Sequence, residues 1–111
     1  MKYAFMLCAV ILCLGSCSKP QLYCGVKNPV RDLAWLKERI ANDPATYDIY
    51  KLKYKNTEGF YFLLRPDVCC DQFTAIYTSC DGTTLYSSGG FAGFNTFPGD
   101  FDSNGGKLVY P

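Results

Sequence analysis

"YDIYKLKYKNTEGFYFLLR", residues 47–65, decides which kind of fold this chain can adopt. From Tyr47 the period changes to two, which places Tyr50, Leu52 and Tyr54 on one side and the intervening lysines on the other, as is typical of a strand with one buried face. The polar turn "KNTEG" (55–59) then leads into "FYFLLR" (60–65), which is apolar on both faces, as a central strand would be. Residues 47–65 therefore predict two neighbouring strands of an antiparallel sheet.

Two further strands are predicted downstream. "QFTAIYTS" (72–79) is rich in β-branched and aromatic residues, and Asp81-Gly82 is a strong turn signal before "TTLYS" (83–87). The tail, 88–111, holds most of the glycines, with Phe91, Phe94, Phe97 and Phe101 between them. We expect it to be an ordered loop whose phenylalanines pack on the sheet, closed by a short strand at 107–110.

One helix is predicted before the strands, within "NPVRDLAWLKERIAND" (28–43). Asn28 is a good N-cap, Pro29 suits the first helical position, and apolar residues recur at three- and four-residue spacing. Trp35 falls off the centre of this apolar face, so it is either covered by a loop or an exposed contact residue. We expect an α+β fold in which one N-terminal helix packs on a four-stranded antiparallel meander, stapled by disulfides.

The N-terminus predicts export. "MKYAFMLCAVILCLGSC" (1–17) has a charged start and an apolar run too short to span a bilayer, which is typical of a secretory signal. Its end, 14–17, resembles the bacterial lipobox, which implies a palmitate-bearing Cys17 as the mature N-terminus. An ordinary cleavage near Ser16 and an uncleaved anchor are the alternatives. We therefore expect a lipoprotein signal peptide at 1–16, a lipidated tether at 17–27 and a single small domain at 28–111.

Four cysteines then remain for structural roles, and the chain has no histidine. An even set in a small exported domain predicts two disulfides among Cys24, Cys69, Cys70 and Cys80. If 72–79 is one extended strand, Cys70 and Cys80 lie about 30 Å apart, whereas a disulfide needs Cα atoms within about 7 Å. We therefore favour Cys24 pairing with Cys69 or Cys70, while the other neighbour pairs with Cys80 or stays unpaired. A strained ring between the two neighbours is a further alternative, and the spacing suits neither a zinc site nor a C-x-x-C redox pair.

No constellation of residues predicts catalysis. "DFDSNG" (100–105) matches half of a calcium loop through Asp100, Asp102 and Asn104, but the twelfth position is Pro111, so a tight turn is favoured. Serine and cysteine nucleophiles lack a histidine base. We expect no enzyme activity and neither metal nor other cofactor. A hydrolase using paired aspartates from the set Asp67, Asp71 and Asp81 is the remaining enzymatic alternative.

The charge balance narrows the class of partner. The formal net charge is +1, without a basic stripe or an acidic tail. Such a chain lacks the electrostatic footprint of a nucleic-acid-binding protein. The glycine-rich "SGGFAGF" (88–94) lacks the lysine that follows a phosphate-binding loop, so nucleotides are not expected either.

Three motifs resemble a known family. "NPVRDLAWLKERI", "VCCDQFTAIYTSCDG" and "GGFAG" followed by "PGDF" are similar to small bacterial envelope lipoproteins built on a domain of unknown function. The resemblance covers roughly 24–102, and its carriers are Cys69, Cys70, Asp71, Gly89, Gly90, Phe91 and Gly93. It implies a fold and an envelope location, and no activity.

The expected function is therefore a non-enzymatic binding module for protein or glycan in the bacterial cell envelope. We expect it to be lipid-anchored at the outer membrane, facing the periplasm, because Ser18-Lys19 does not begin an acidic export run. Its candidate binding surface comprises Trp35, Phe91, Phe94 and Phe97. The alternative is an inhibitor of an envelope-attacking hydrolase, a lysozyme or a protease, with residues 88–104 as the plug.

Overall fold

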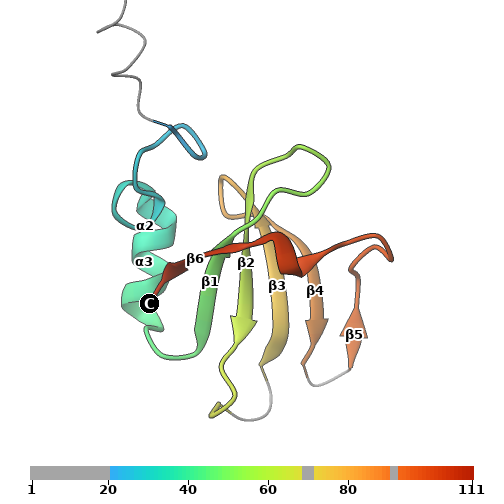
Figure 1. Cartoon of the computed structure of the whole chain (residues 1–111). Helices are drawn as coiled ribbons and strands as arrows, with labels where there is room; N and C mark the ends of the chain where they lie inside the picture. The colour runs from blue at the N-terminus through green and yellow to red at the C-terminus, as the bar shows by residue number, and fades with distance from the viewer. Residues whose placement is uncertain (1–20, 69–71, 91–92) are drawn as a thin grey trace, which may run out of the picture.

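A computed structural model describes residues 21–68, 72–90 and 93–111 (Figure 1). Within these described residues, two short helices are followed by six strands and one 3-10 turn. In chain order the elements are α2 (Pro29–Asp32), α3 (Ala34–Asn42), β1 (Tyr47–Lys51), β2 (Gly59–Leu64), β3 (Phe73–Ser79), β4 (Thr84–Gly89), β5 (Phe94–Asn95), η1 (Ser103–Gly105) and β6 (Lys107–Tyr110).

All six strands form one antiparallel sheet, in the order β5-β4-β3-β2-β1-β6. Strands β1 to β4 are the predicted meander. The prediction of a four-stranded sheet is nevertheless wrong, because β5 pairs with β4 at one edge and β6 pairs with β1 at the other. Strand β5 is too short to show a period. It forms because the glycines around it take positive φ angles and let the chain turn back on β4.

The prediction of one continuous N-terminal helix is also wrong. Leu33 has extended backbone angles, φ −87° and ψ 112°, and separates the single turn of α2 from α3. The backbone N–H of Asn28 donates to the Asp32 carboxylate, which closes that turn at its start. Leu33 itself packs against the core, so burial of its side chain outweighs continuation of the helix.

The core lies between the helices and one face of the sheet. It is formed by Leu36 of α3 together with sheet residues on that face and Tyr23: the buried set is Tyr23, Leu36, Ile49, Phe60, Phe62 and Ile76. Tyr23 lies in the segment expected to be a tether. Its hydroxyl donates to the carbonyl of Gly59 (2.6 Å) and accepts from the N–H of Gly59 (2.9 Å). The folded part of the chain therefore begins before residue 28.

The opposite face of the sheet is covered by the C-terminal tail. Residues 96–106 leave β5 at one edge, cross the sheet and enter β6 at the other edge, as Figure 1 shows. Adjacent strand residues point to opposite faces, so the sheet presents Tyr61, Tyr77 and Tyr86 on this side. Phe97 and Phe101 pack on these rings. The prediction that tail phenylalanines pack on the sheet is confirmed for these two, and the predicted closing strand is β6.

Within residues 21–68, 72–90 and 93–111, no helix has the length and apolar character of a membrane span.

Candidate functional site

A disulfide links Cys24 to Cys80, with a Cα–Cα distance of 5.5 Å. The prediction of a disulfide is confirmed, but the favoured pairing of Cys24 with Cys69 or Cys70 is wrong. Cys80 follows β3, and the turn after β3 lies at the same end of the sheet as the β1–β2 turn and the start of the described chain (Figure 1). Docking of Tyr23 on Gly59 therefore brings Cys24 to Cys80. Cys69 and Cys70 lie outside the described residues, so a second bridge stays a prediction.

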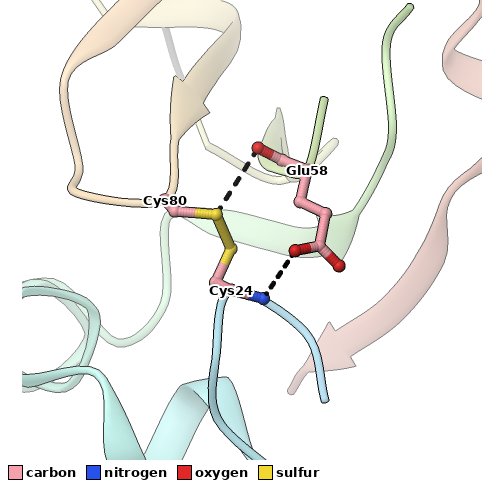
Figure 2. A group of neighbouring side chains, drawn as sticks. All are labelled: Cys24, Glu58 and Cys80. Carbon is pink, nitrogen blue, oxygen red and sulfur yellow. Dashed lines mark hydrogen bonds between the residues drawn. A yellow bond between two sulfur atoms is a disulfide. The ribbon is translucent and has the colours of Figure 1, made fainter. Parts of the chain in front are cut away.

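Glu58 completes the surroundings of this disulfide (Figure 2). Its carboxylate accepts the backbone N–H of Cys24 at 3.0 Å, and its carbonyl oxygen lies 3.5 Å from Sγ of Cys80. In the part of the chain that the structure describes, Cys24, Glu58 and Cys80 are the only three potential metal ligands close enough to share an ion. Zinc binds thiolates, whereas these sulfurs are bonded to each other. The cluster is therefore a structural staple.

The two aspartates of the calcium-like motif, Asp100 and Asp102, have different hydrogen-bond partners. Asp100 accepts the Tyr54 hydroxyl at 2.6 Å, and this hydrogen bond lowers the pKa of the Asp100 carboxyl. Asp102 instead accepts the backbone N–H of Asn104 at 2.9 Å and caps η1. Both carboxylates thus serve the crossing segment and the turn within it.

Asp81 also accepts hydrogen bonds from residues of its own turn. The Ser79 hydroxyl and the backbone N–H of Thr83 donate to it, and these bonds lower the pKa of Asp81 to about 2. A general acid needs the opposite shift, toward neutral pH. Asp81 therefore stabilises its turn in the ionised form. Asp71 lies outside the described residues.

The candidate binding residues fall into different environments. Trp35 packs edge-on against Phe60 at 5.7 Å, and its Nε1 donates to the carbonyl of Cys80 at 2.7 Å. Gly82 lies so close that a Cβ there would meet the Trp35 ring at 2.8 Å. The turn after β3 therefore covers Trp35, as one of the two interpretations predicted. Phe94 is 62% exposed, Phe97 is partly buried, and Phe91 lies outside the described residues.

A groove of about 340 Å³ lies where the crossing segment meets the sheet. We call it the aromatic groove; its lining residues are Tyr61, Leu63, Thr74, Ala75, Ser88, Asn95, Phe97, Phe101 and Ser103. The lining side chains are aromatic, aliphatic, hydroxyl and amide groups, with no charge among them. Of the predicted surface residues that the structure describes, Trp35, Phe94 and Phe97, only Phe97 belongs to it.

The rings of the aromatic groove are held by each other. Phe97 and Phe101 lie 4.8 Å apart between ring centroids, and Tyr61 lies 6.1 Å and 5.9 Å from them. Asn95 accepts the backbone N–H of Phe97 at 3.0 Å through its side-chain oxygen. Among the described residues, the amide NH₂ of Asn95 has no hydrogen-bond acceptor, since only its oxygen is engaged. The groove therefore combines a preformed aromatic surface with uncharged donors and acceptors.

A second hollow, of about 470 Å³, lies beside the N-terminal segment and β6. We call it the lysine pocket, because Lys27, Lys51, Lys53 and Lys107 all line it, together with Glu58 and Asp102. The sequence showed no basic stripe because these lysines come from three separate segments. The sequence predicted neither hollow, because each is assembled from residues far apart in the chain.

Comparison of the chain with protein-family models, curated proteins and solved structures finds no significant match. The resemblance to envelope lipoproteins therefore rests on the sequence motifs, and the function must be argued from the two hollows.

Proposed function

We propose that this chain is a lipid-anchored envelope protein that binds a glycan in the aromatic groove, without catalysing a reaction. The observation that carries the proposal is the composition of the groove: Tyr61, Phe97 and Phe101 beside hydroxyl and amide groups. The C–H face of a sugar ring packs on an aromatic face, while its hydroxyls exchange hydrogen bonds with neutral polar groups. A charged lining would instead favour an ionic ligand.

The size of the groove favours a short glycan segment over a folded protein partner. Small-ligand sites are concave and begin at about 300 Å³, and the aromatic groove measures about 340 Å³. A stable protein interface buries about 800 Å² on each partner. The groove offers less than such a surface, and part of its aromatic area is already used in packing the crossing segment on the sheet.

The proposed anchor is the lipid on Cys17. The lipobox-like end of the signal supports it. Since one acyl chain alone would hold the protein only marginally, firm anchoring requires more than one chain at this position. The proposed location is the outer membrane, facing the periplasm, where envelope glycans lie within reach of the domain.

The proposal is tested by cosedimentation of purified protein with insoluble peptidoglycan and with other envelope polysaccharides. The test variant is Asn95→Ala/Ser103→Ala, which removes polar groups of the aromatic groove that are exposed in the fold. Asn104→Ala, on the same turn but outside the groove, is the matched control. We expect the double variant to lose binding and the control to retain it. Equal binding by all three proteins would refute the proposal.

Phe94 favours a second candidate function, inhibition of an envelope-attacking hydrolase. It lies on the edge strand β5 and is 62% exposed, and an exposed aromatic residue on an open edge can insert into an active-site cleft. Assays of lysozymes and proteases with added protein test this function. Inhibition that is lost in Phe94→Ala would support it, whereas no slowing at micromolar protein would exclude it.

A further inference from the structure

Four positive charges gather in the lysine pocket of a protein whose formal net charge is +1. Lys27 precedes α2, Lys51 ends β1, Lys53 follows it, and Lys107 begins β6. Among residues 21–68, 72–90 and 93–111, none of the four forms a salt bridge. The Lys51 ammonium lies 5.5 Å from the centre of the Tyr23 ring.

The two acidic residues of the pocket each accept a hydrogen bond from a backbone N–H. Glu58 accepts the backbone N–H of Cys24, and Asp102 accepts the backbone N–H of Asn104. These bonds hold the two carboxylates on the backbone of neighbouring segments. Both carboxylates keep their charge, but four lysines against two carboxylates still leave the lining of the pocket with an excess of positive charge, which a bound anion would offset.

The strand register places two of these lysines directly against each other. Lys51 on β1 and Lys107 on β6 are paired residues, and residues paired in this way have Cβ atoms about 5 Å apart. Like charges in such positions destabilise a sheet. An anion held between them would remove that repulsion, so the arrangement favours an anionic ligand over an empty pocket.

The pocket also lies close to the proposed anchor. Gln21 lines it, and the four residues from Cys17 to Gln21 span at most about 14 Å. The aromatic groove extends toward the other end of the strands, because Leu63 of the groove pairs with Ala75, whereas Gly59, next to Glu58, pairs with Ser79. The two hollows adjoin at η1, where Asp102 lines the pocket and Ser103 lines the groove. A lipid on Cys17 would therefore bring the lysine pocket to the membrane surface.

We propose that the lysine pocket binds the phosphate of an anionic phospholipid headgroup in the membrane that carries the anchor. This inference rests on the lipid anchor of the proposed function. Phosphate oxygens accept hydrogen bonds from several ammonium groups at once, and each lysine near an anionic membrane surface adds attraction. Binding there fixes the orientation of the domain on the bilayer.

The experiment measures the reactivity of each lysine in the full chain toward a water-soluble amine-acylating reagent, read by mass spectrometry. The protein is mixed with phosphatidylcholine vesicles or with vesicles that also contain about 30% phosphatidylglycerol. We expect the anionic lipid to slow acylation of Lys27, Lys51, Lys53 and Lys107 by about threefold or more. Lys37, exposed on α3, is the internal control and should not change.

Two variants sharpen the result. Lys53→Gln removes one charge of the pocket and should weaken the protection of the other three lysines, whereas Lys37→Gln should leave it unchanged. Equal slowing at Lys37 and at the pocket lysines would overturn the proposal, because it would indicate a general surface effect. Equal protection by soluble glycerol phosphate with phosphatidylcholine vesicles would also overturn it, because the ligand would then be a free phosphate.

Failure of the anchor is read separately, by flotation of the full chain with phosphatidylcholine vesicles. A chain that does not float with them refutes lipidation at Cys17. If the chain does not float, selective protection of the four lysines by the anionic vesicles would still support the pocket. If that protection is also absent, both the anchor and the pocket are refuted.

Discussion

Removal of the Cys24–Cys80 disulfide should lower the free energy of unfolding by about 4 kcal/mol. The bridge closes a loop with a sequence separation of 56 residues. The chain-entropy relation for a loop of this length gives roughly 14 cal/mol/K of entropy removed from the unfolded chain, which is about 4 kcal/mol at 25 °C. Since the domain is small, this loss corresponds to a fall in Tm of about 20 °C.

The assay compares the chain from Ser18 onward with its Cys24→Ala/Cys80→Ala variant, both carrying Cys69→Ser and Cys70→Ser to prevent exchange. Trp35 is the single tryptophan and lies against the carbonyl of Cys80, so its fluorescence reports urea unfolding at the bridge. Reduction should bring the parent to the stability of the variant and leave the variant unchanged. Stabilities of the oxidised parent and the variant within about 1 kcal/mol would refute the reasoning, as would peptide mapping of the unsubstituted chain that joined Cys24 to Cys69 or Cys70.

Three other substitutions test separate parts of the structure. Tyr23→Phe should lower the free energy of unfolding by about 2 kcal/mol, because two hydrogen bonds to Gly59 are lost; an unchanged urea midpoint would show that the hydroxyl is not needed. Lys107→Glu should raise the free energy of unfolding by about 0.5 kcal/mol, because an opposite charge then faces Lys51. The same substitution should reduce the protection of the other pocket lysines by anionic lipid. A loss of stability would contradict the pairing of Lys51 with Lys107. Asp81 has a pKa lowered to about 2 by its Ser79 and Thr83 partners, so its contribution to stability is complete above the unfolded pKa near 4 and is lost as pH falls toward 2. Asp81→Asn should flatten that part of a stability–pH curve, and identical curves would show that the turn does not depend on this charge.

Local patterns predicted the parts of the fold that depend on neighbouring residues. The alternation in 47–54, the turn at 55–59 and the Asp81-Gly82 turn predicted β1 to β4, because hairpins join strands that are adjacent in sequence. Pairing of β6 with β1 joins the last strand to the first, and no local pattern reports such a contact. The break at Leu33 depends on packing against the core, which helical periodicity does not include.

The disulfide and the two hollows show the same limit. Strand length correctly indicated that Cys80 is remote from the start of β3, but the position of Cys24 depends on docking of Tyr23 on Gly59. The aromatic groove likewise depends on where the crossing segment lies. Phe97 was predicted as a binding residue from composition, whereas Phe101 and Asn95 gain their place only through the path of the chain across the sheet.

The position of the disulfide within the chain has a consequence for proteolysis. A protease that cut at any single peptide bond between Cys24 and Cys80 would leave both fragments covalently joined. A cut just after Cys80 would free a fragment that contains β4 to β6 and most of the aromatic groove. That fragment would be held by hydrogen bonds and packing alone, so one cleavage at the exposed Asp81 turn would let β4 to β6 separate from the rest of the domain.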